Sequence, residues 1–149
     1  MRHIFTLTLL VLIFAGCANR SEYFTSTFTK DKTTIENIDI LADDLYEYIL
    51  SNFTKNDTVL YIYTSDYDKS FYNYLTSKLR DEGYAITDDP KVDKPIYISY
   101  KITKEDDLFL VSWNLGVSKI NRIYRLDTDY NKLVPIGNIT GFNLLKRGE

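Results

Sequence analysis

Cys17 is the residue whose position most directly implies chemistry. It is the only cysteine in the chain, and Phe14, Ala15 and Gly16 precede it. Small residues directly before a cysteine are typical of a lipobox, in which the cysteine thiol becomes joined to lipid. Arg2 and an apolar run from residue 4 to residue 14 provide the other parts of a signal peptide. We therefore expect cleavage before Cys17 and attachment of lipid, palmitate included, to that residue.

The apolar run is too short to span a bilayer as a helix. A membrane-spanning helix needs roughly twenty apolar residues, whereas the apolar region of a signal peptide needs about seven to fifteen. The residues that follow, 18–22, are polar. Two other interpretations are a cleaved secretory signal with an incidental cysteine and a buried helix. The position of the single cysteine favours lipidation.

Few other side chains offer reactive groups. His3 is the only histidine and would leave with the signal peptide, so a Ser-His-Asp triad and a Cys/His metal site are excluded from the mature chain. No glycine-rich phosphate loop is present. An enzyme would have to use carboxylates, hydroxyls or lysines, and no spacing supports one. We predict no catalytic residue, no cofactor and no small-molecule substrate.

Carboxylates gather in three short clusters that calcium could in principle use. The clusters are Asp88, Asp89 and Asp93, then Glu105, Asp106 and Asp107, then Asp127 and Asp129. The spacing of an EF-hand loop is absent, and aspartate is a common turn residue. We interpret all three clusters as turns and predict no metal site.

Arg122 and Arg125 lie three residues apart in a segment with strand character. Side chains alternate along a strand, so the two arginines should point to opposite faces. We interpret them as solvent-facing or edge cations that discourage aggregation. In the alternative, one of them faces the helices or a partner and pairs with a carboxylate.

The composition predicts a single folded domain without affinity for nucleic acid. The net charge is −3, and it becomes −4 when Arg2 leaves with the signal peptide; nucleic-acid binding normally needs a basic face. We expect a signal peptide at 1–16, a lipidated cysteine with a polar tether at 17–32, one periplasmic domain at 33–143 and a tail at 144–149. Tyr23, Phe24 and Phe28 are apolar exceptions in the tether, which in a second interpretation dock on the domain or on a partner.

The first half of the domain alternates helix and strand patterns. A helix is expected from Thr33, because apolar residues recur at three- and four-residue steps up to Ile49. Thr58–Thr64 reads as a strand. A second helix follows to Glu82, ending at Gly83, and a short strand covers Tyr84–Thr87.

The second half is predicted to be an antiparallel meander. Four alternating segments, Ile96–Ile102, Leu108–Leu115, Ser118–Leu126 and Lys132–Ile136, are joined by short turns. The whole pattern predicts an α+β fold, with two helices packed on one face of a mainly antiparallel sheet of about five to six strands.

This arrangement resembles the TrbH family of conjugal transfer lipoproteins, found with type IV secretion systems. The resemblance covers about residues 35–137 and is carried by the lipobox and by four segments: Leu41–Asp44, Leu79–Ile86, Arg122–Arg125 and Leu133–Gly137. The Asp88–Lys94 connection is shorter than the Pro/Ala-rich stretch of the family. The family is not catalytic, so the resemblance implies no active-site residue.

The resemblance implies a structural lipoprotein that docks other subunits of an envelope-spanning complex. Ala18 favours the periplasmic face of the outer membrane, because an aspartate after the lipidated cysteine is the usual signal for inner-membrane retention. The alternative is an accessory or regulatory periplasmic lipoprotein of another envelope machine.

Overall fold

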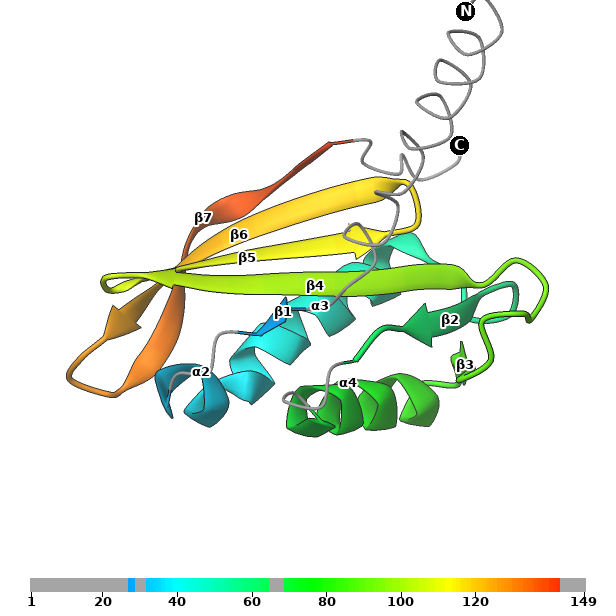
Figure 1. Cartoon of the computed structure of the whole chain (residues 1–149), viewed down its shortest axis with the longest axis horizontal. Helices are drawn as coiled ribbons and strands as arrows, with labels where there is room; N and C mark the ends of the chain where they lie inside the picture. The colour runs from blue at the N-terminus through cyan, green and yellow to red at the C-terminus, as the bar shows by residue number, and fades with distance from the viewer. Residues whose placement is uncertain (1–26, 29–31, 65–68, 143–149) are drawn as a thin grey trace, which may run out of the picture.

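Among the described residues, helices and strands are interspersed up to residue 86, and only strands follow (Figure 1). The computed structural model describes residues 27–28, 32–64 and 69–142. The helices are α2 (Lys32–Glu36), α3 (Ile38–Asn52) and α4 (Lys69–Asp81), and the strands are β1 (Thr27–Phe28), β2 (Val59–Ile62), β3 (Ala85–Ile86), β4 (Ile96–Glu105), β5 (Leu108–Leu115), β6 (Ser118–Asp127) and β7 (Lys132–Phe142).

All seven strands belong to one mixed sheet. The order β3-β2-β4-β5-β6-β7 accounts for six of them, and β1 pairs with β4 off this path. The pairs from β4 to β7 are antiparallel, whereas β2 runs parallel to both β3 and β4. The predicted α+β class with a mostly antiparallel sheet is confirmed. The parallel pairs and the seventh strand were not expected.

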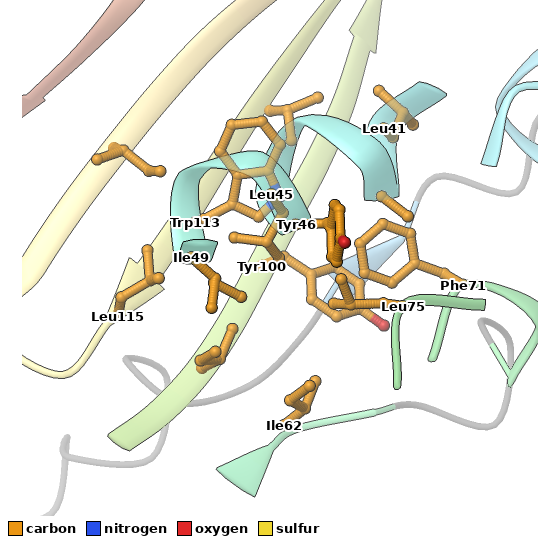
Figure 2. Close-up of a cluster of buried hydrophobic side chains, with 14 of the residues drawn as sticks. Leu41, Leu45, Tyr46, Ile49, Ile62, Phe71, Leu75, Tyr100, Trp113 and Leu115 are labelled. Carbon is orange, nitrogen blue, oxygen red and sulfur yellow. The ribbon is translucent and has the colours of Figure 1, made fainter. Parts of the chain in front are cut away.

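One face of the sheet, called here the inner face, contributes most of the core. It bears Tyr100 of β4, Trp113 of β5 and Tyr124 of β6, all without exposed surface. Figure 2 shows Tyr100 and Trp113 beside apolar side chains of α3 and α4. The rings of Phe71 and Tyr100 lie 4.5 Å apart, which joins α4 directly to this face.

The predicted first helix is interrupted at Asn37, which separates α2 from α3. The buried side-chain amide of Asn37 donates to the backbone oxygen of Thr33 at 2.8 Å, and its oxygen accepts the backbone N–H of Leu133 at 2.9 Å. The expectation of one continuous helix was therefore wrong. The apolar period continues through the break, and the Leu133 N–H that bonds to Asn37 comes from β7, far away in the sequence.

The end of α4 agrees with the sequence prediction. Gly83 has a φ of +94°, a conformation that side chains other than glycine rarely adopt. The Tyr84 N–H donates to the oxygen of Leu79 at 2.9 Å, which closes the helix end. The chain then turns directly into β3.

β1 lies inside the segment predicted as a tether. Thr27 and Phe28 run parallel to Lys101 and Ile102 of β4, so the sheet begins before residue 33, where the predicted domain starts. Cys17, Tyr23 and Phe24 lie outside the described residues, as do the signal peptide and the tail at 144–149. Within the described ranges, no helix combines the length and apolar character needed to cross a membrane.

Candidate docking surface

The face of the sheet opposite the core, called here the outer face, carries apolar side chains that contact solvent. Strand registry aligns Thr103, Leu110, Ile123 and Ile136 in one row across β4 to β7. Because side chains alternate along a strand, these residues point away from the neighbouring core positions. Three of the four are large apolar residues, and they form the centre of the surface.

A second row borders the first at the end of the sheet that carries the β4–β5 turn. It consists of Glu105, Leu108, Arg125 and Val134. The two rows together give an outer-face patch of five apolar side chains that are between 37% and 47% exposed: Leu108, Leu110, Ile123, Val134 and Ile136. Exposed apolar clusters of this kind mark interaction sites more often than scattered apolar residues do.

The outer-face patch is hollowed in two places. A depression of about 320 Å³ is lined by Leu108, Leu110 and Ile123 together with Thr103, Lys104 and Glu105. A second, of about 260 Å³, lies by Val134 and Ile136 and is bordered by Arg125, Leu126 and Asp127. A partner's side chains would fill such hollows by packing, without any chemistry.

Tight turns hold the strands of this surface in register. Asp106 has a φ of 54° in the β4–β5 turn and Asn131 a φ of 51° before β7, both residue types that tolerate the left-handed region. The carboxylate of Asp127 accepts the N–H of Asp129 at 3.0 Å, which is a local turn bond. The carboxylate-rich segments therefore shape the edges of the surface.

The three carboxylate clusters form no metal centre in the described part of the chain. No group of three or more His, Cys, Asp or Glu side chains there is arranged to hold an ion. Asp89 accepts the N–H of Lys91 at 2.9 Å, and Asp88 accepts the hydroxyl of Tyr72 at 2.7 Å. These bonds support the interpretation of the clusters as turn and loop residues.

The inner face holds a polar cluster of Asp44, Arg122 and Tyr124. Arg122 Nη1 lies 2.7 Å from Asp44 Oδ2, and the same oxygen accepts the Tyr124 hydroxyl. The side chains of Arg122 and Asp44 are only 19% and 23% exposed. Both interactions tie α3 to β6, so the cluster fixes a helix on the sheet.

This cluster corrects the interpretation of the two arginines as solvent-facing cations. They do lie on opposite faces, but Arg122 faces α3 and is paired. Arg125 points outward with a side chain 62% exposed, and its Nε lies 3.6 Å from Asp107 Oδ2. Arg122 is paired because α3 packs against the inner face of the sheet. The residues near Arg122 in the sequence do not predict that contact.

Tyr124 is held in its neutral, hydrogen-donating form. Burial raises the pKa of the Tyr124 phenol well above its ordinary value, and the hydrogen bond to the Asp44 carboxylate raises it further. The positive charge of Arg122 lowers the pKa of Tyr124, but this effect is smaller than the two that raise it. With Tyr124 protonated and Asp44 paired, the cluster offers no free base and serves a structural role.

Comparison with known protein families decides where the chain belongs. A family model described as conjugal transfer protein TrbH matches residues 19–143. The chain belongs to the TrbH family. The resemblance stated from the sequence is confirmed, and the matched range covers every described helix and strand. Comparison with curated proteins and with solved structures gave no match.

TrbH membership makes the chain a conjugal transfer protein, a class that works with type IV secretion in a multi-protein complex at the cell envelope. TrbH is not a known enzyme family. Two of the segments that carry the resemblance, Leu41–Asp44 and Arg122–Arg125, meet at the Asp44–Arg122 ion pair. This ion pair therefore joins two of those segments across the fold.

The outer-face patch was predictable in part. The alternation in β5 places Phe109, Val111, Trp113 and Leu115 on one side of that strand, and these residues are buried. Leu108 and Leu110 on the other side are also large and apolar. Leu108 and Leu110 were therefore the signal in the sequence for an apolar outer face. The residues of β6 and β7 that complete the patch could not be identified without the strand registry.

Proposed function

We propose that this TrbH protein is a structural lipoprotein, anchored in the outer membrane through lipid on Cys17. In this proposal the periplasmic domain presents a docking surface to other protein subunits of the conjugal transfer apparatus. The lipid determines where the domain is held, and the sheet determines what it binds. No nucleic acid and no small molecule takes part in this function.

The anchor is supported by the sequence before the domain. A short apolar run, small residues and a single cysteine occur in lipobox order, and Ala18 follows the cysteine. One acyl chain binds a membrane only marginally, whereas two or more give stable attachment. A mature lipoprotein normally carries several chains, so attachment through Cys17 would be lasting.

The outer-face patch carries the docking part of the proposal. Leu110 and Ile123 sit at its centre, and the polar residues Thr103, Glu105 and Arg125 share its two rows. Docking sites typically combine a buried apolar centre with a polar rim. A core position would face the helices; these side chains face solvent and are available to a protein partner.

Site-specific photocrosslinking in cells tests the proposal. A photoreactive residue at Leu110 is expected to capture subunits of the transfer apparatus in membranes of mating-competent cells. The same residue at exposed Ser77 on α4 serves as the control and should capture none of them. A Leu110 probe that gives no crosslink to any transfer subunit, with the protein recovered alone from cells with an intact apparatus, would refute the docking function.

A further inference from the structure

We propose that the outer face binds a second copy of this chain, with a two-fold axis running along β5. The inference rests on the proposed function in taking the outer face as a docking surface. The second copy occupies that surface when other transfer subunits are absent, and those subunits replace it in the assembled apparatus. The argument uses the registry of the two rows, their charges and the state of the β7 edge.

Registry places an acidic and a basic residue symmetrically about β5. Glu105 on β4 and Arg125 on β6 both pair with Leu108, from opposite sides. They lie two strands apart, or about 10 Å, because neighbouring strands are about 4.8 Å apart. Within one molecule Arg125 is paired with Asp107 and not with Glu105.

A two-fold rotation about an axis parallel to β5 exchanges the positions of β4 and β6. When two outer faces stack in this way, Glu105 of each copy faces Arg125 of the other. Leu110 faces its own counterpart across the axis, and Leu108 does the same. The surface is therefore complementary to itself in both charge and apolar character, which is the requirement for a two-fold interface.

The charges at this surface are available for such contacts. Glu105 is exposed and makes no ion pair within the described ranges. Arg125 has only the exposed, 3.6 Å pair with Asp107, and exposed pairs of this kind contribute little to stability. Arg125 can donate to a second carboxylate while it remains paired with Asp107, since a guanidinium has several N–H donors.

Packing of two sheets face to face also suits the geometry of the patch. Stacked sheets lie about 10 Å apart with their inner side chains interdigitated. Leu108 and Leu110 border the depression of about 320 Å³. A leucine from the second copy would enter that depression and remove apolar surface from water on both sides.

The β7 edge of the sheet is a poorer place for a second copy. β7 is the last strand, but it contains Pro135, which lacks a backbone donor, and Gly137 with a φ of 72°. The registry with β6 is also broken between Asn121 and Ile123. Proline, bulges and irregular edges oppose strand addition. Association through the outer face is therefore favoured over association through the β7 edge.

Thiol crosslinking tests the two-fold contact with the full-length chain in cell membranes. Leu110→Cys, expressed without any other transfer gene, is expected to give a covalent homodimer with a short bismaleimide, because sheets stacked about 10 Å apart hold the two facing thiols beyond the reach of a direct disulfide. Ser77→Cys on α4 is the matched control and should stay monomeric. The parent chain, whose only cysteine is Cys17, should also stay monomeric. Absence of a Leu110→Cys homodimer, or equal dimer from Ser77→Cys, would overturn the inference.

Reciprocal charge reversal provides the second test. Glu105→Arg alone and Arg125→Glu alone should each weaken dimerisation of the full-length chain by roughly tenfold, because like charges then face each other. The double variant, with both reversals, should recover the parent dissociation constant. Single variants that dimerise as the parent does, or a double variant as weak as the single ones, would contradict the proposed pairing.

The two proposals fail in different ways. If the outer face docks only other transfer subunits, the Leu110 probe captures those subunits while Leu110→Cys yields no homodimer. If the conjugal docking function is wrong but the self-association is right, the homodimer forms and no transfer subunit is captured. Each result identifies which of the two statements is false.

Discussion

Removal of the Asp44 carboxylate is expected to destabilise the fold far more than removal of the neighbouring Asp43 carboxylate. Asp44→Ala leaves the Arg122 guanidinium, only 19% exposed, without its ion-pair partner, and leaves the fully buried Tyr124 hydroxyl without its acceptor. Hydrogen bonds to charged groups contribute about 1.5–3 kcal/mol each. Because the pair retains some contact with water, we expect a combined loss of about 2–4 kcal/mol in the free energy of unfolding.

Asp43→Ala is the matched control, one residue away on the same helix. Asp43 pairs with Lys78 at 2.7 Å, but the two side chains are 45% and 35% exposed. Exposed ion pairs typically contribute about 0–1 kcal/mol, so this variant should unfold almost as the parent does. Asp44→Asn, which keeps an acceptor oxygen for Tyr124 and loses the charge, should fall between the two.

Urea unfolding followed by the fluorescence of Trp113 measures this difference. Trp113 is the only tryptophan and has no exposed surface, so its emission reports directly on the core between the helices and the sheet. Equal unfolding free energies for Asp44→Ala and Asp43→Ala would refute the structural role assigned to the Asp44–Arg122–Tyr124 cluster.

Three further substitutions test other parts of the account. Tyr124→Phe should be less stable than the parent at pH 8. Above pH 10 this difference in unfolding free energy should shrink by up to about 1.4 kcal/mol per pH unit, because tyrosine ionises in the unfolded chain while the raised pKa keeps folded Tyr124 protonated. A difference that stays constant to pH 11 in unfolding titrations would be inconsistent with this. Asn37→Ala leaves the Leu133 N–H without its acceptor. The free energy of unfolding, measured by chemical denaturation, should fall by about 1–3 kcal/mol; an unchanged value would show that this bond does not stabilise the fold. Phe71→Ala removes a fully buried ring packed on Tyr100 and should cost about 3–5 kcal/mol, seen as a lower thermal midpoint; an unchanged midpoint would contradict the packing of α4 on the inner face.

Local patterns were sufficient to predict much of the fold. Alternation in β5, with Phe109, Val111 and Trp113 on one side, defines a strand and its buried face. Gly83 ends α4 through its own backbone freedom. Such features depend on a few consecutive residues, so the sequence reports them directly.

Features that depend on distant segments could not be predicted in this way. The side chain of Asn37 bonds to the backbone of Leu133, and the pairing of Arg122 requires Asp44 on another element. β1 is only two residues long and is defined by its contact with β4. The outer-face patch likewise exists only once β5, β6 and β7 are aligned, although Leu108 and Leu110 signalled one strand of it.

The central claim is that this protein acts through position, with lipid on Cys17 holding the domain at the outer membrane. Mass spectrometry of the N-terminal peptide, from protein isolated in the outer-membrane fraction, tests it most directly. The account predicts a mature chain that begins at Cys17 and carries several acyl chains, and a Cys17→Ser chain that carries none. A chain recovered with residues 1–16 still attached, or with Cys17 unmodified, would contradict it.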